Sequence, residues 1–244
     1  MASLTVAARS RADLQPGFVL HTYPFSESSL IADIFVRGAG RIVMVAKGAR
    51  RPRSNVRGLL VSFQPVAVAW TGKGEVRTLT RIEWVGGMPL PRGENLLCGF
   101  YLNELLLRTI ARDDPHDSLF EHYAHALDDL ARGALPAPVL RSFEKRLLQE
   151  LGYAMTLTAT VDGEAVEPDG LYTYVPERGA LAITRERDNI MRVHGKTLLD
   201  LHDDDFTDSR TQLEAKQLMR HLINHRLDDR PLLSRQVFRD MQSP

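Results

Sequence analysis

The chain has 244 residues, 43% hydrophobic and 25% charged, which is the composition of a folded globular protein and excludes a disordered one. Its 31 basic and 31 acidic residues cancel, yet the first 90 residues carry twelve basic residues against five acidic ones. That excess of seven positive charges, balanced by a negative excess in the remainder, is a sign of a polyanionic partner such as a nucleic acid or a membrane surface.

Other classes of protein are excluded by what the chain lacks. Its single cysteine, Cys98, allows neither an internal disulfide nor a cysteine-based zinc site. No apolar run reaches the roughly 20 residues that a membrane-spanning helix needs, and the first residues lack the apolar core of a signal peptide. We therefore expect a cytoplasmic protein.

The first third of the chain predicts short strands. These segments are rich in β-branched residues, alternate between apolar and polar positions, and are bounded by Gly, Pro and Asn. The expected strands are Phe18–Tyr23, Ser29–Val36, Arg41–Ala46, Val61–Trp70 and Val76–Trp84. Because no long helix separates them, they indicate a small closed barrel, which hides its strand edges.

The rest of the chain predicts helices with a small β insertion. Composition changes near Pro89, and helical spacing of apolar residues then predicts helices over Asn95–Ala111, over Ser118–Ala131 with Asp117 as its cap, and from Pro138 to Gly152. Short strands are expected at Thr156–Val161, Leu171–Val175 and Leu181–Ile183, and helices again at Ser209–His225 and Leu232–Met241. The expected fold class is α+β, with domains at 1–88, at 89–152 together with 195–244, and at 153–194 for the insertion.

The most informative feature is a span without acids. Between Asp33 and Glu75 lie eight basic residues and no acidic one: Arg37, Arg41, Lys47, Arg50, Arg51, Arg53, Arg57 and Lys73. Gly48 and Pro52 make the centre of this span a loop that projects from the barrel. Loops of such barrels often bind single-stranded nucleic acid, whose phosphates Arg and Lys neutralise. A solvated basic loop without a ligand and, more weakly, a membrane surface are the alternatives.

Aromatic residues are the second candidate for contacts with bases. Phe18, Phe35 and Phe63 occupy alternating positions and are expected in the core. Tyr23 and Phe25 flank Pro24 and are better candidates for the surface, where bases stack on aromatic rings. We include Tyr23 in the predicted DNA-binding set.

Catalytic and metal-binding motifs are not found. His221 and His225 have the spacing of a metalloprotease pair, but Leu222 occupies the place of its general base. Consecutive side chains at Asp203–Asp205 cannot all reach one ion, so a solvated acidic turn is favoured there. The glycine-rich turns lack the strand–loop–helix context of a nucleotide-binding loop. We expect no enzymatic activity, no cofactor and no metal.

Several motifs in the correct order resemble the RecO family of bacterial DNA repair proteins. The segments are 18–30, with Phe18-Val-Leu-His and Tyr23-Pro-Phe-Ser-Glu-Ser-Ser-Leu30, and 40–50, Gly-Arg-Ile-Val-Met-Val-Ala-Lys-Gly-Ala-Arg. Further matches are Tyr101–Leu106, residues 140–153 with Leu-Gly-Tyr at their end, and Arg230–Arg235. The resemblance covers nearly the whole chain.

This resemblance implies an amino-terminal OB-fold barrel and a helical domain with a small inserted module. It implies a recombination mediator, not an enzyme, that binds single- and double-stranded DNA. Such a mediator anneals complementary strands coated with single-stranded DNA-binding protein, and with RecR it promotes RecA loading on gapped DNA. A place at the bacterial nucleoid and no membrane contact follow. Many family members hold zinc through four cysteines in the insertion, but residues 154–195 contain no cysteine, so a zinc-less module is expected here.

The family also implies a docking site for the acidic tail of single-stranded DNA-binding protein on the helical domain. Such a site needs an apolar pocket with a basic rim, and the candidates are Leu140, Arg141, Leu147 and Leu148. An intrahelical pair of Arg141 with Glu144 is the equally weighted alternative. For the whole chain, the alternative function is a protein-interaction adaptor whose basic loop binds an acidic protein.

Overall fold

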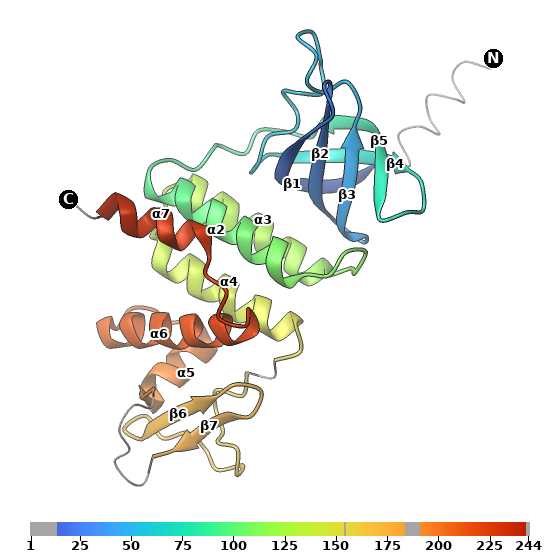
Figure 1. The fold of residues 1–244 in the computed structure, drawn as a ribbon. Helices are drawn as coiled ribbons and strands as arrows, with labels where there is room; N and C mark the ends of the chain where they lie inside the picture. The colour runs from blue at the N-terminus through green and yellow to red at the C-terminus, as the bar shows by residue number, and fades with distance from the viewer. Residues whose placement is uncertain (1–13, 154, 184–190, 243–244) are drawn as a thin grey trace, which may run out of the picture. The chain divides into compact units, whose positions relative to one another are not determined.

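The computed structural model describes residues 14–153, 155–183 and 191–242. Its internal contacts divide the chain into two compact units, one that ends at Arg132 and one that begins at Gly133. The first unit holds a barrel and two helices, and the second holds the remaining helices and a small sheet (Figure 1).

The barrel consists of β1 (Gln15–Phe25), β2 (Ser29–Val36), β3 (Gly40–Ala46), β4 (Pro65–Thr71) and β5 (Val76–Trp84). It is closed, with the strand order β1-β2-β3-β5-β4. β3 and β5 are parallel and the other neighbouring strands are antiparallel. The expected class, an α+β protein with an amino-terminal OB-fold barrel, is confirmed.

Alternation along the strands gives the barrel two apolar surfaces. One set of side chains fills the interior, among them Val19, Ile34 and Met44. The opposite set includes Phe18 and Phe35, which pack on Phe120 and Tyr123 of a helix, with ring centroids 5.3–6.2 Å apart. The expected core positions Phe18, Phe35 and Phe63 are all buried, so that prediction is confirmed.

Two helices, α2 (Glu94–Thr109) and α3 (Asp117–Ala131), complete the first unit. A buried polar network joins them to the barrel. The Asn103 amide donates to the backbone carbonyl of Leu20 (2.8 Å), and the Tyr123 hydroxyl donates to Asn103 Oδ1 (2.5 Å). Each of these buried polar groups therefore has a partner, which removes the cost of placing them in an apolar interior.

The connection between α2 and α3 lies directly on the barrel. The Asp113 amide donates to the Arg41 carbonyl (3.1 Å), and the Arg77 guanidinium pairs with the Asp113 carboxylate (2.5 Å). Gly40 permits this approach, because a Cβ atom there would lie 2.0 Å from the Asp114 carbonyl oxygen and φ is +75°. Helices and barrel are thus joined by ion pairs and backbone bonds as well as by apolar packing.

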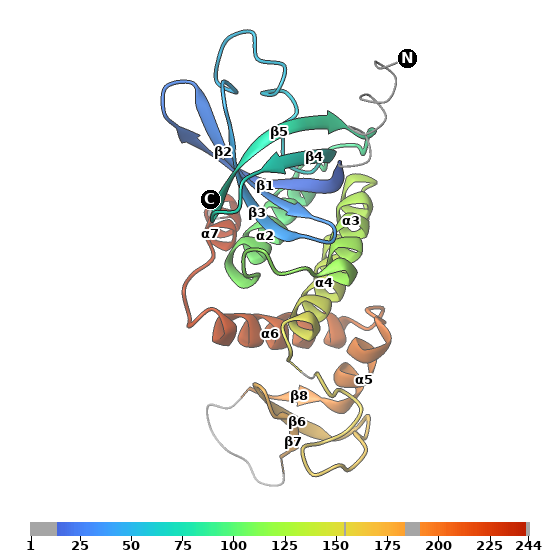
Figure 2. The same ribbon diagram turned by 90° about the vertical axis from the view of Figure 1, so that its right-hand side faces the viewer.

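The second unit contains α4 (Pro136–Glu150), α5 (Gly195–Asp203), α6 (Ser209–Arg226) and α7 (Leu233–Gln242). Its sheet has the order β7-β6-β8, formed by β6 (Leu171–Val175), β7 (Gly179–Ala182) and β8 (Val193–His194). Figure 2 shows this sheet with α5 following directly from β8. None of the helices in the described residues is long and apolar enough to cross a membrane.

Two expected strands differ from the structure, and one helix of the structure was not expected. β4 begins at Pro65 and not at Val61, because the chain turns at Phe63 (φ +70°) to insert that ring beside Gly99 and Phe100. The strand expected over 156–161 is wrong, since only isolated bridges form at Ala159 and Thr160. The helix α5 was not expected; it has only nine residues and begins with glycine.

The expected cap of α3 is also wrong. Asp117 is the first residue of the helix, and no side chain caps it. Its carboxylate instead accepts a hydrogen bond from the Gly38 amide at the β2–β3 hairpin, 2.6 Å away. Asp117 therefore contributes to the contact between barrel and helices.

The inserted module is tied to α6 by one carboxylate. Glu214 accepts from the His194 amide (2.9 Å), the His194 Nδ1 (2.7 Å) and the Thr197 hydroxyl (2.8 Å). These donors lie at the start of α5, which has no side-chain cap of its own. Burial raises the pKa of Glu214, but the three hydrogen bonds and the nearby His194 outweigh it, so the pKa lies below its ordinary value.

We predict that Glu214→Gln lowers the free energy of unfolding of the second unit by about 1–3 kcal/mol at pH 7, because donors lose a charged acceptor. A carboxyl with a lowered pKa stabilises above its unfolded-state pKa of about 4.5 and loses that effect as pH falls through the folded-state value. The difference in Tm between Glu214→Gln and wild type should therefore shrink between pH 7 and pH 3. Glu164→Gln, which changes an exposed carboxylate in the same unit, serves as the control. A Tm difference that is independent of pH would contradict this role.

Candidate nucleic-acid interface

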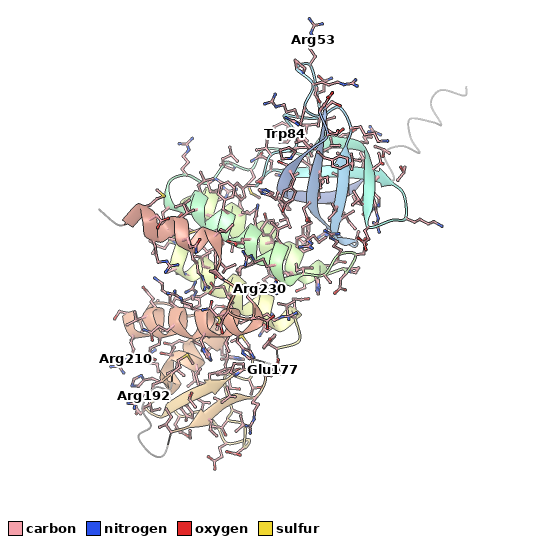
Figure 3. The ribbon with its side chains drawn as sticks, viewed as in Figure 1. Arg53, Trp84, Glu177, Arg192, Arg210 and Arg230 are labelled. Atoms are coloured by element: carbon pink, nitrogen blue, oxygen red, sulfur yellow. The ribbon has the colours of Figure 1, made fainter. Side chains whose placement is uncertain are left out.

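The long connection from β3 to β4 brings several segments together on the barrel. It leaves β3 beside the β1–β2 turn, as the pairs Phe25↔Ser29 and Leu30↔Ala46 show, and it joins β4 beside the last residue of β5 and the first half of β1, as the pairs Val66↔Trp84 and Phe18↔Pro65 show. We call this connection, with the segments at its two ends, the loop end. Figure 3 shows Arg53 at the tip of that connection and Trp84 near its base.

The connection from Lys47 to Gln64 is folded. Ala49 and Leu60 belong to the barrel core, and Val56 and Leu59 pack against it. Arg50 fixes its start, because its amide donates to the Ser28 carbonyl (2.9 Å) and its guanidinium to the Ser26 carbonyl (2.8 Å). The loop is thus held against the β1–β2 turn by apolar and polar contacts.

Besides Arg50, four cations of this loop are exposed. Lys47, Arg51, Arg53 and Arg57 all face solvent, and among the described residues none of them forms a salt bridge. No nearby carboxylate offsets the positive potential of these cations, so they are available to phosphates. Lys73 is also exposed but lies in the β4–β5 hairpin, at the opposite end of the barrel.

Two residues of the predicted set are engaged in the fold. The Arg37 guanidinium pairs with Glu121 of α3 and lies 5.9 Å from the centroid of Phe120. Arg41 is nearly buried; it donates to the Leu107 carbonyl, and its Nε lies 3.6 Å from an Asp33 carboxylate oxygen. The pKa of Asp33 lies above its ordinary value, because the effect of burial exceeds the opposing effect of the nearby cations Arg41, Arg112 and His21. The structure therefore separates Arg37 and Arg41 from the exposed cations of the loop.

Exposed aromatic rings lie at the loop end as well. Tyr23 is 45% exposed, Phe25 46% and Trp84 60%, and the His21 and Tyr23 rings are 4.4 Å apart. Tyr23 and Phe25 thus reach the surface, as their position beside Pro24 predicts. Trp84 is absent from the predicted set, although its place at the end of a strand before Gly86-Gly87 could have identified it.

The predicted partner site on α4 is mostly buried. Arg141 forms a bidentate ion pair with Glu144, with N–O distances of 2.7 and 2.8 Å, and both side chains are buried. Leu147 and Leu148 are also buried, and Leu140 is half-buried. Of the two alternatives for Arg141, the structure contains the intrahelical pair.

The chemical groups of the loop end are suited to binding a polyanion. Within the described ranges, no three His, Cys, Asp or Glu side chains are placed to hold a metal ion. Cys98 is buried on α2. What the loop end offers is positive charge beside flat aromatic surfaces, which suits phosphates and unstacked bases.

A closed barrel of this strand order, followed by helices with a small inserted sheet, defines an OB-fold protein with a helical extension. Two family models cover nearly all of it: "Recombination protein O N terminal" matches residues 13–88, and "Recombination protein O C terminal" matches residues 90–236. The chain belongs to the RecO family.

Curated relatives agree with this assignment. A "DNA repair protein RecO" of Dechloromonas aromatica is 51% identical over 96% of this chain and 98% of its own length. A protein of the same name in Ralstonia nicotianae is 50% identical over 96% of this chain and 87% of its own length. Another, in Azoarcus sp., is 50% identical over 97% of this chain and 99% of its own length.

Proposed function

We propose that the chain is a DNA-binding mediator of DNA repair and homologous recombination that acts without bond chemistry. It binds single- and double-stranded DNA, anneals complementary strands coated with single-stranded DNA-binding protein, and with RecR promotes RecA loading on gapped DNA. Family membership and the names of the relatives support this role. We expect it to act at the nucleoid in the bacterial cytoplasm.

One observation carries the proposal: unpaired cations and exposed aromatic rings share the loop end of the barrel. Lys47, Arg51, Arg53 and Arg57 would hold phosphates, with Arg50 positioning the loop. Tyr23, Phe25 and Trp84 would stack on bases, which contributes about 1–3 kcal/mol per base. Lys73 adds charge at the other end of the barrel. We assign no ligand contact to Arg37, Arg41 and Arg141, because each of them already pairs with a carboxylate.

The test is annealing of complementary oligonucleotides coated with the cognate single-stranded DNA-binding protein. We expect the wild-type chain to accelerate annealing, and the acceleration to weaken between 50 and 200 mM salt as phosphate contacts are lost. The adaptor alternative predicts no binding of naked oligonucleotide. A chain that binds neither naked nor coated strands at 50 mM salt would overturn the proposal.

A further inference from the structure

The helix α6 carries a second set of unpaired cations. Its inner face buries Thr211, Ala215, Leu218, Met219 and Leu222, which leaves the opposite face exposed. On that face lie Arg210, Lys216 and Arg220, which we call the α6 stripe; Figure 3 shows Arg210 at the start of the helix. Helical periodicity places these three positions within one exposed face.

No free acid lies on this face. The single acidic residue of α6, Glu214, is engaged by His194 and Thr197, and Asp208 caps the helix by accepting from the Arg210 and Thr211 amides at 2.8 and 3.0 Å. In the described part of the chain, the stripe cations form no salt bridge. This is unusual for the second unit, in which eighteen acidic residues outnumber fifteen basic ones.

The spacing suits a row of phosphates. With a rise of about 1.5 Å per residue, Lys216 and Arg220 are about 6 Å apart along the helix, and the stripe is about 15 Å long. A nucleic-acid strand presents one charge about every 3.4 Å, so the stripe can meet several phosphates in a row. Between the cations lie Gln217, a neutral donor to phosphate oxygens, and Leu213, which is 58% exposed and offers an apolar contact.

We propose that the α6 stripe is a second binding surface for the phosphate backbone of single-stranded DNA. This inference rests on the proposed function: a protein that anneals must hold two strands, and each unit of this chain then provides one surface. The loop end would hold one strand and the α6 stripe the complementary one.

The experiment compares two triple variants that remove equal charge from the same unit. The test variant is Arg210→Gln, Lys216→Gln and Arg220→Gln, in which glutamine keeps helix propensity. The control variant is Arg146→Gln, Arg178→Gln and Arg230→Gln, which also removes three exposed cations. Circular dichroism checks folding, fluorescence anisotropy measures affinity for one labelled oligonucleotide, and energy transfer between labelled complementary strands measures annealing.

We expect the affinity of the test variant for a single labelled oligonucleotide to stay within about twofold of wild type, because the loop end holds that strand. Annealing of naked complementary strands should slow at least tenfold relative to the control variant. Equal annealing by both variants would overturn the inference. Normal annealing of naked strands with a defect only on coated strands would also overturn it, because the stripe would then bind an acidic protein. If wild-type protein itself bound no oligonucleotide, the proposed function would fail instead.

Discussion

Replacing Lys47, Arg51, Arg53 and Arg57 with alanine lowers affinity for a single-stranded oligonucleotide on the order of 100-fold at physiological salt. Each lost phosphate contact removes about 0.7 from the slope of log K against log salt, so four contacts lower the slope by about 3. The barrel keeps its stability, because these side chains are exposed and form no salt bridge with any described residue. Fluorescence anisotropy titrations between 50 and 300 mM salt measure both quantities.

Two control variants make this result specific. Arg51→Lys, Arg53→Lys and Arg57→Lys together retain the charge and should retain most of the salt slope. Arg37→Ala removes a cation that Glu121 already neutralises, and it should leave the slope unchanged. A quadruple alanine variant with a native circular dichroism spectrum and wild-type affinity would place the DNA site elsewhere.

The second large effect concerns the stability of the first unit. Asn103→Ala leaves the Tyr123 hydroxyl and the Leu20 carbonyl without their partner in a buried site, and it opens a cavity. We expect a loss of about 3 kcal/mol in the free energy of unfolding, or roughly 6–12 °C in Tm. Thermal unfolding followed by circular dichroism measures this, with Asn55→Ala in the exposed loop as a control that should change the stability by less than about 0.5 kcal/mol.

The same network predicts a dependence on alkaline pH. Burial raises the pKa of Tyr123, so the folded state keeps the proton that donates to Asn103. A raised folded-state pKa gives stability that is present below the unfolded-state value of about 10 and is lost as pH rises beyond it. Tyr123→Phe should reduce that loss above pH 10.

An Asn103→Ala protein with wild-type Tm would show that the network adds nothing to stability.

Periodicity predicted the elements whose burial is regular. Alternation identified four of the barrel strands within a few residues, and helical spacing identified α2, α3, α4, α6 and α7. It misplaced the start of β4 because Val61 and Phe63 resemble a strand, whereas the Phe63 ring is buried by a turn and by close packing on Gly99. The helix α5 lacks a comparable signal, since its start is held by Glu214 from another element.

The candidate interface was predictable in charge but not in detail. The acid-free span identified the basic loop, yet sequence cannot tell which cations are already paired. Arg37 meets Glu121 across 84 positions of sequence, and the Arg41 guanidinium reaches the Leu107 carbonyl. Trp84 reaches the loop end because the last residue of β5 pairs with Val66 at the start of β4, a pairing that alternation does not reveal.

The location of the DNA site is tested most directly by the fluorescence of Trp84. The chain has two tryptophans, so Trp70→Phe leaves Trp84, 60% exposed at the loop end, as the single reporter. Titration with an unlabelled single-stranded oligonucleotide should quench this fluorescence to saturation, and added salt should restore it as phosphate contacts are lost. Oligonucleotide binding detected by anisotropy without any change in Trp84 emission would contradict a site at the loop end.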